Sequence, residues 1–556
     1  MYLYLTTLAL LLGLSVSAAS LCPPTGPVLP FPRISPNESG HGLTQRLDEF
    51  VRGAKVAGWN TSVNSFSVIA TSADATFFDY HYTAPVKNES GVLHVDGNTV
   101  YSAASITKVF TVLAVWLDER MNLDDPIGNY VQELNSSEWG DVTLRLLTSQ
   151  IAAVPRNGYT FDNAPQAVEL AGLGFPELSP GEMPPCSLAP GLRMCSREEF
   201  FSSFSEFGFT GQVGDRVAYS DLAYILLGYA LEDITGLPYS QVLKESILDV
   251  VGLSDTGFDS VEASRMIIPS EAAFWIDIDW AYYVKTAGLY STPNDLSAFA
   301  RAIYNNTLLS RARTNEWLKP SAFTSQLDNS VGAPWEIFRP TTLTKDGRPV
   351  DHYTKSGDLP GFSSSYLVLV PEFELGVTIL SAGPDASTLV PLLLDTVQAA
   401  LIPFLDQLAR VQAVEMYAGT YYESQAGNKS AEISLEVDDG PGLKVTSWKK
   451  GRIDMLKSFD VVLFGADAEE ALPVDVRFYP IGEDERWYAG FSEADTKIQQ
   501  GAGPLRGSAC MPWYRVDQFH YGRVRLDEVA FRRNEDGGIE GLEVPGLRGS
   551  FDKVKV

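Results

Sequence analysis

The clearest apolar pattern in the chain follows residues 101–108, Tyr-Ser-Ala-Ala-Ser-Ile-Thr-Lys. Apolar residues then recur at i, i+3, i+4, i+7 and i+8, a spacing that predicts a helix with one buried face. These residues are Val109, Val112, Leu113, Trp116 and Leu117. Ser105 therefore lies at the mouth of this helix, and Lys108 lies one turn further on. Because residues three apart share a side of a helix, the pattern places an amine beside a hydroxyl, near backbone N–H groups that favour negative charge.

The spacing alone is a weak signal, because Ser-x-x-Lys recurs twice more, at 447–450 and 550–553. Helix N-capping is an ordinary use of serine, and a lysine in the first turn is usually solvated. A serine becomes a good nucleophile only when a base takes its proton, and a desolvated neutral lysine is one such base. The remaining motifs must therefore decide whether Ser105 and Lys108 carry chemistry.

Apolar periodicity also predicts the surrounding elements. The predicted helices cover 43–51, 222–235 and 391–402, and the predicted strands cover 66–71, 76–82, 352–356, 366–370 and 376–381. Residues 141–260 are expected to be mostly helical, apart from a long proline-rich loop from 172 to 192. Helices at both ends with strands between them indicate an α+β fold, an antiparallel sheet flanked by terminal helices with an inserted helical subdomain. From Met416 onward the chain is strand-like, which predicts a separate all-β domain, a small barrel or sandwich.

With 556 residues the chain is too long for one ordinary core. The first 20 residues carry no charged side chain, and an apolar run from Leu5 to Val16 ends in small residues. This composition predicts a secretory signal peptide cleaved near Ala19, with an uncleaved signal anchor as the alternative. We expect a signal peptide at 1–19, an extended N-terminal arm at 20–41, the α+β domain at 42–411 and the β-domain at 412–556.

The formal net charge is −28. An acidic surface of this size argues against sequence-blind nucleic-acid binding and against binding to anionic membranes. Beyond the predicted signal peptide we find no other stretch of about 18 apolar residues, which predicts no stable membrane insertion. The sequence leaves the oligomeric state open.

Four cysteines remain after the predicted cleavage, and an even count in a secreted chain suggests two disulfides. Cys186 and Cys195 flank a short loop and are the easiest pair to close, which leaves Cys22 with Cys510. The chain has no Cys-x-x-Cys pair and only five histidines, so a zinc site is not expected. Glycosylation sequons stand at Asn37, Asn60, Asn88, Asn135, Asn305 and Asn428.

Three motifs in order resemble those of the serine β-lactamase and penicillin-binding-protein family, in its class C-like branch. They are Ser105-Ile106-Thr107-Lys108, Tyr219-Ser220-Asp221 in place of Tyr-x-Asn, and Lys355-Ser356-Gly357 in place of Lys-Thr-Gly or His-x-Gly. The resemblance covers roughly residues 42 to 405 and separates Ser105 from the two other Ser-x-x-Lys matches. Residues 417–421 resemble the start of the lipocalin-like β-domain appended to many β-lactamase-related esterases and peptidases. The chain as a whole resembles a fungal-type secreted member of this family.

The resemblance implies catalytic roles for the first two motifs. Ser105 is expected to attack a carbonyl and form an acyl-enzyme, while Lys108 and Tyr219 form the base system that takes its proton. The N–H groups of Ser105 and Asp358 are expected to form the oxyanion hole. Outside this context Tyr219 is more simply a buried tyrosine ahead of a helix.

The third motif is expected to bind substrate. Lys355 binds a substrate carboxylate or orients Tyr219, and Ser356 and Gly357 lie beside it in the substrate site. The glycine is expected to leave room for substrate backbone along the strand. The simpler alternative is that residues 355–357 form an exposed turn.

Asp221 is the main departure from the family pattern, which has asparagine there. A carboxylate near Lys108 favours the ammonium form, so we expect it to raise the pKa of Lys108 and weaken that lysine as a base. Then Tyr219 carries more of the base role, or activity is reduced, or Asp221 points elsewhere, for instance as the N-cap of helix 222–235. A second departure is Ser-Gln-Ile-Ala at 149–152, where relatives often have His-Thr-Ser-Gly, so that wall of the pocket is expected to differ.

The motifs imply a secreted serine hydrolase or acyltransferase that acts on an ester or amide through a Ser105 acyl-enzyme. The expected partners are small-molecule esters, amides or peptides, and no metal or cofactor is expected. The appended β-domain and the long insert favour esterase, peptidase or biosynthetic acyl-transfer activity over β-lactam resistance. The alternative is a catalytically impaired binding or scaffold protein that keeps the fold, for which Asp221 is the best support. An α/β-hydrolase is excluded because the chain has no Gly-x-Ser-x-Gly elbow.

Overall fold

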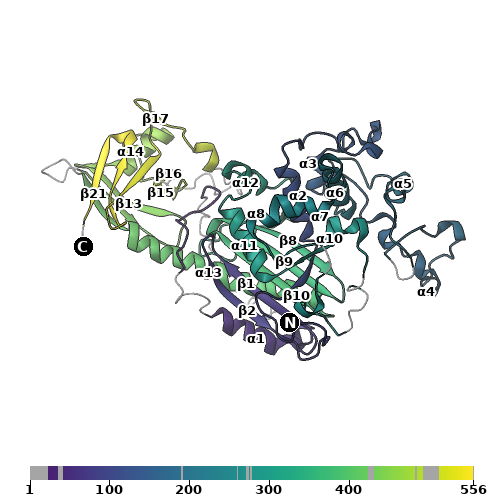
Figure 1. Ribbon diagram of the computed structural model, residues 1–556. Helices are drawn as coiled ribbons and strands as arrows, with labels where there is room; N and C mark the ends of the chain where they lie inside the picture. Colours follow the sequence, from purple (N-terminus) through teal and green to yellow (C-terminus); the bar gives the residue numbers. More distant parts are fainter. Residues whose placement is uncertain are drawn as a thin grey trace, which may run out of the picture. The chain divides into compact units, whose positions relative to one another are not determined.

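A computed structural model describes residues 23–34, 42–188, 192–258, 261–270, 275, 278–423, 431–482, 485–492 and 512–554. The predicted signal peptide therefore lies outside the described residues. The chain divides into two compact units (Figure 1). The main unit comprises Ile34–Pro340 and Val350–Leu401, and the C-terminal unit comprises Met1–Arg33, Thr341–Pro349 and Ile402–Val556.

An antiparallel sheet of eight strands, in the order β2-β1-β10-β9-β8-β7-β6-β5, forms the centre of the main unit. Its strands are β1 (Ser65–Thr71), β2 (Thr76–Tyr82), β5 (Ala322–Phe323), β6 (Asn329–Val331), β7 (Glu336–Phe338), β8 (His352–Leu359), β9 (Ser363–Val370) and β10 (Leu375–Ala382). Strands β1 and β10 are buried at every position. Their side chains are apolar or small and hydroxylated, which lets both faces of the strands be covered. The predicted α+β fold and its sheet are confirmed.

Helices surround this sheet and build the inserted subdomain. They are α1 (Leu43–Ala57), α2 (Thr107–Leu117), α3 (Leu144–Thr148), α4 (Ala167–Ala171), α5 (Arg197–Phe207), α6 (Asp221–Thr235), α7 (Tyr239–Leu243), α8 (Asp249–Val251), α10 (Val284–Ala287), α11 (Pro293–Tyr304) and α12 (Arg311–Trp317). Helices α2, α3, α6, α7 and α10 gather beside one another, whereas α4 and α5 lie further out (Figure 1). Helix α11 packs on β1 and β10. All but one residue of α2 is buried, so this helix is part of the core.

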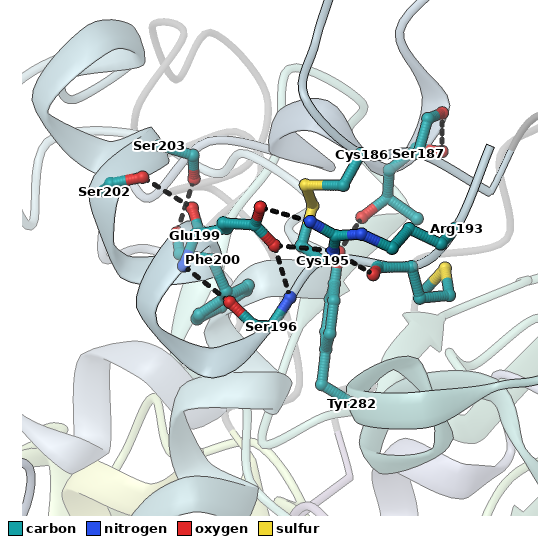
Figure 2. Close-up of a disulfide and its surroundings, with 12 residues drawn as sticks. Cys186, Ser187, Arg193, Cys195, Ser196, Glu199, Phe200, Ser202, Ser203 and Tyr282 are labelled. Carbon is teal, nitrogen blue, oxygen red and sulfur yellow. Dashed lines mark hydrogen bonds and ion pairs between the residues drawn. A yellow bond between two sulfur atoms is a disulfide. The ribbon is translucent and has the colours of Figure 1, made fainter.

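A disulfide joins Cys186 to Cys195 at the end of the long loop, as predicted. Figure 2 shows that this bond precedes the start of α5, where Ser196 and Glu199 form a reciprocal capping box. Arg193 also donates to the Glu199 carboxylate from inside the disulfide-closed loop. The bond and the cap together tie the end of the insert to the first turn of the helix. The second predicted pair, Cys22 with Cys510, lies outside the described residues.

Helix α13 (Ala386–Tyr417) is 32 residues long and corrects two predictions. The predicted helix began at Pro391 and ended at Ile402, because proline usually ends or opens a helix, but α13 runs past both Pro391 and Pro403. It also contains an 18-residue window of mean hydropathy 1.7, so the chain does hold a second stretch long and apolar enough to span a membrane. Half of that window is buried inside the protein. The division between the two units falls within α13, after Leu401.

The C-terminal unit contains a closed antiparallel barrel, which confirms the predicted all-β domain. Its strands are β11 (Gly419–Glu423), β12 (Ala431–Glu436), β13 (Leu443–Lys450), β15 (Asp475–Pro480), β16 (Arg486–Ser492), β19 (Glu528–Arg533), β20 (Ile539–Val544) and β21 (Gly549–Lys553). Pairing of β12 with β13 closes the ring of eight strands, which leaves no open edge. The smaller elements of this unit are β14 (Ile453–Asp454), α14 (Met455–Phe459), β17 (His520–Tyr521) and β18 (Val524–Arg525).

Two distant segments complete the C-terminal unit. Val28 and Leu29, from the predicted N-terminal arm, are buried in the same apolar cluster as the barrel residues. Arg348, from Thr341–Pro349, donates to Asp406 over 2.9 Å and to Asp346 over 2.7 Å, and all three side chains are buried. The unit is therefore assembled from three stretches of chain.

The face-to-face contact between Phe110 of α2 and Phe299 of α11 generates a stability prediction. The ring centroids lie 4.4 Å apart, and both residues are fully buried. Phe110→Ala should destabilise the main unit by about 3–5 kcal/mol, because it removes a large apolar side chain and leaves a cavity. Denaturant unfolding followed by tryptophan fluorescence measures the change. Val56→Ala, at a fully solvated position of α1, is the control and should change stability by less than about 0.5 kcal/mol; equal effects of the two substitutions would contradict the prediction.

Candidate active site

Ser105 lies in the turn between β3 (Tyr101–Ala104) and α2, and it is partly exposed although its neighbours are buried. Strand β3 pairs with β4 (Leu289–Ser291), which holds the approach to this turn. Ala104 has φ = 46°, in the left-handed region that residues with a side chain rarely occupy. The N-cap of α2 is Ile106, so Ser105 does not cap the helix. Its hydroxyl instead accepts hydrogen bonds from two side chains of the site.

Lys108 is fully buried, and its amine contacts Ser105 directly. Nζ donates to Ser105 Oγ over 2.8 Å, to Asp221 Oδ1 over 2.6 Å and to the Thr286 carbonyl oxygen over 3.0 Å. An ammonium group has three N–H bonds, so each of them has an acceptor. The Lys108 amine and the Ser105 hydroxyl are therefore as close as predicted, and the three acceptors match the three N–H bonds of the protonated amine.

Tyr219 supplies the second contact to the Ser105 hydroxyl. Its hydroxyl donates to Ser105 Oγ over 3.0 Å. Burial raises the pKa of Tyr219 to about 12, although Lys355 nearby acts in the opposite direction. Tyr219 is therefore a phenol at neutral pH and a proton donor to Ser105. Its ring lies beneath two further cations, with Arg156 Cζ 4.8 Å and Lys355 Nζ 5.2 Å from the ring centroid.

Asp221 points into the site and is not a helix cap. Ser220 is the N-cap of α6 and its hydroxyl accepts from Ala223 N, whereas Asp221 is the first helical residue. Asp221 Oδ1 accepts from Lys108 and, over 3.0 Å, from Thr286 Oγ1. With the amide of Asn157 oriented so that nitrogen faces the carboxylate, its Nδ2 donates to Asp221 Oδ2 over 2.8 Å. The alternatives in which Asp221 points elsewhere or caps the helix are therefore wrong.

The pKa of Lys108 is lowered, whereas the sequence predicted that Asp221 would raise it. Burial lowers this pKa, Asp221 and Glu336 raise it, and burial is the largest effect, so the pKa lies below its usual value. Asp221 thus acts in the predicted direction without determining the outcome. Burial by itself would raise the pKa of Asp221, but the Lys108 ammonium and hydrogen bonds from Lys108, Tyr283 and Thr286 outweigh it, so that pKa is lowered.

The third motif lies on the central strand β8 and is not an exposed turn. Lys355 is fully buried, and its Nζ donates to Glu336 Oε1 over 2.5 Å and to the Ser356 carbonyl oxygen over 2.8 Å. Glu336 lies on β7, which pairs with β8. Ser356 donates to the same carboxylate from its N–H over 2.9 Å and from its hydroxyl over 3.0 Å. The motif is therefore built around a carboxylate from within the protein.

Gly357 leaves room for the chain's own backbone, while its predicted role beside the substrate stays a prediction. A Cβ at Gly357 would lie 2.9 Å from Ser105 N and closer still to the Ala103 carbonyl oxygen. Real Cβ atoms do not approach so closely, so only glycine lets β8 lie against the turn that carries Ser105. Asp358 follows on β8; its side chain is exposed and accepts from Ser387 Oγ over 2.6 Å.

The segment 149–152 supports the second motif. Gln150 has φ = 62°, and its side-chain Oε1 accepts from Ser220 N over 2.8 Å. Its carbonyl oxygen accepts from Ala218 N over 2.8 Å. Gln150, in the segment expected to differ from relatives, therefore holds the backbone on both sides of Tyr219.

The structure brings together site residues that the motifs did not indicate. They are Glu336, Asn157, Thr286, Arg156 and Gln150. Each lies far along the chain from the residue that it contacts, or outside any recognisable pattern, so no local signal in the sequence could have indicated its role. For Gln150 there was a partial signal, because the wall of the pocket formed by residues 149–152 was expected to differ.

Four of the six sequons fall within the described residues. Asn60, Asn135 and Asn305 are exposed and Asn88 is partly buried, while Asn37 and Asn428 lie outside. Glycosylation stays a prediction. Across the residues that the structure describes, no group of three or more His, Cys, Asp or Glu side chains is placed to hold a metal ion.

Comparison with known proteins bears on the site as a whole. The model of the beta-lactamase family matches residues 61–398, and a model described as "Beta-lactamase-like-like, C-terminal domain" matches residues 409–555. A "Beta-lactamase-like protein" from Arthroderma benhamiae is 30% identical over 95% of both chains. A "Probable hydrolase" from Phoma sp. is 26% identical over 78% of this chain and 74% of its own.

Solved structures are similar at lower identity. "A class C beta-lactamase" covers 65% of this chain and 96% of its own, with 15% identity and a TM-score of 0.48. The octameric penicillin-binding protein homologue from Pyrococcus abyssi covers 81% of this chain and 98% of its own, with 17% identity and a TM-score of 0.47. Because the family model covers more than half of the chain and the Arthroderma relative aligns over nearly all of it, the chain belongs to the beta-lactamase family.

Proposed function

We propose that this protein is a secreted serine hydrolase or acyltransferase that acts on an ester or amide through an acyl-enzyme at Ser105. The observation that carries the proposal is the convergence of Lys108 Nζ and Tyr219 Oη on Ser105 Oγ, at 2.8 and 3.0 Å. Two proton-transfer groups at one hydroxyl are what activation of a serine requires. The family is one of hydrolases by the names of several relatives, which supports the same reaction class.

The proposed first step joins Ser105 Oγ to the carbonyl carbon of the substrate. The proton of Ser105 passes to Lys108 in its neutral form, which burial makes accessible by lowering the pKa of that lysine. Tyr219, a phenol at neutral pH, gives its proton to the leaving oxygen or nitrogen as its bond to the carbonyl breaks, and the proton that Lys108 took from Ser105 replaces it. The N–H groups of Ser105 and Asp358 hold the negative charge that develops on the carbonyl oxygen.

Water or another acceptor then attacks the acyl-enzyme, and the same groups return the proton to Ser105. These steps use side chains, backbone and water alone. The proposed substrates are small esters, amides or peptides. One relative, from Escherichia coli, is named a D-alanyl-D-alanine-carboxypeptidase/endopeptidase, and it supports amide or peptide bonds as substrates.

A second candidate function is a binding or scaffold protein with impaired catalysis. The contact of 2.6 Å between Lys108 and Asp221 favours it, because a carboxylate at this distance stabilises the ammonium form, which cannot accept a proton. The two candidates differ in whether Ser105 reacts with an acyl donor.

Covalent labelling distinguishes them. A fluorophosphonate or penicillin probe should label the protein at Ser105, because neutral Lys108 beside the hydroxyl can take its proton, and mass spectrometry of the peptides identifies the site. Ser105→Ala should abolish both labelling and turnover of p-nitrophenyl esters, which is a loss of at least about a thousandfold for a nucleophile. A folded wild-type protein that is neither labelled nor active would reject the enzyme.

Replacing the carboxylate beside Lys108 tests whether Asp221 raises the pKa of that lysine and so limits activity. Asp221→Asn removes an effect that raises the pKa of Lys108, so this pKa should fall further and more of the amine should be neutral at pH 7. The acidic limb of the kcat/KM profile should move to lower pH, and activity at pH 7 should rise several-fold.

Asp124→Asn is the matched control, because Asp124 is exposed and pairs with Arg145 at the surface; its pH profile should match that of the wild type. If Asp221→Asn instead abolishes activity while the protein stays folded, then Asp221 supports catalysis and does not restrain it.

A further inference from the structure

An internal carboxylate occupies the donors of the third motif. Glu336 accepts hydrogen bonds from Lys355 Nζ, Ser356 N and Ser356 Oγ, at 2.5, 2.9 and 3.0 Å. Lys355 is fully buried, and its ammonium also donates to the Ser356 carbonyl oxygen. The positive charge of this motif is therefore already neutralised before any substrate arrives.

The carboxylate is close to the reacting groups and accessible. Lys355 Nζ lies 5.2 Å from the centroid of the Tyr219 ring, and the hydroxyl of that ring contacts Ser105. A quarter of the Glu336 side chain is exposed, so solvent and substrate can reach it. The negative charge of Glu336 is close enough to Tyr219 and Lys108 to act on both, in the direction that raises their pKa values.

The charges at the third motif favour neutral over anionic groups. Lys355 contributes one positive charge and Glu336 one negative charge, so the pair is neutral, while the cation Arg156 lies over the Tyr219 ring. A substrate carboxylate placed against the donors of this motif meets a neutralised cation and the like charge of Glu336. Juxtaposed like charges are strongly unfavourable, and burial strengthens the effect.

We propose that Glu336 is a specificity-determining residue that excludes acyl donors bearing a carboxylate near the scissile carbonyl, so that the substrates are neutral there. This inference rests on the proposed function of Ser105. Of the two roles that the sequence allowed for Lys355, it favours the orientation of Tyr219. The carboxylate that the ammonium binds is then Glu336, from within the protein, and not one of the substrate.

Two esters of nearly equal size test the proposal in the wild-type protein: p-nitrophenyl pentanoate, which is neutral, and mono-(p-nitrophenyl) glutarate, which carries a carboxylate. After correction for spontaneous hydrolysis, kcat/KM at pH 7 should favour the pentanoate by roughly tenfold or more. Equal rates, or a preference for the glutarate, would overturn the proposal without requiring any variant.

Substitutions then assign the preference to Glu336. Glu336→Gln removes the negative charge and leaves the Lys355 ammonium available, so the ratio of pentanoate to glutarate should fall by roughly tenfold or more. A purely structural role would lower both rates together and leave the ratio unchanged, which would contradict the proposal.

The double variant Glu336→Gln/Lys355→Gln guards against misfolding, because removing both members of a buried pair is better tolerated than removing one. Its ratio should approach one, and circular dichroism checks that it is folded; a ratio that stays at the wild-type value would overturn the assignment. Failure of the proposed function is a separate result, since it would appear as ester turnover that survives Ser105→Ala.

Discussion

A lysine amine held out of water beside Ser105 is the constraint on which the site depends. Burying an ammonium costs several kcal/mol, and the cost is offset only when acceptors of good geometry surround it. For Lys108 these acceptors are Ser105, Asp221 and the Thr286 carbonyl, from the turn before α2, from α6 and from α10. The packing of these three helices and the position of the amine are therefore parts of one arrangement.

Lys355 follows the same principle on the other side of Tyr219. Each buried lysine has a carboxylate from within the protein, Asp221 for Lys108 and Glu336 for Lys355. The tyrosine ring thus lies near two cations whose charges are balanced locally. Fixed charges of this kind need little reorganisation when charge develops during a reaction, which is how preorganised sites act.

The order of the three motifs was enough to predict the fold and the residues that meet at Ser105, because each motif starts or lies on a regular element whose periodicity is visible locally. Glu336 could not be predicted, since it reaches Lys355 through strand pairing between β7 and β8. The direction of the Lys108 pKa shift was also out of reach, because it depends on how deeply the amine is buried. Helix α13 was predicted too short because two prolines are accommodated within it, against the usual local rule.

The apolar core of the C-terminal unit includes residues from near the start of the chain. Val28 and Leu29 fill its apolar core, and Arg348 pairs with Asp406, so residues 402–556 alone do not contain the whole unit. During synthesis on the ribosome the N-terminal segment leaves the exit tunnel first, yet the barrel that covers Val28 and Leu29 is translated last. Val28 and Leu29 can therefore reach their native positions in this core only after the final strand, β21, has emerged. The first and the last parts of the chain complete the folding of this unit together.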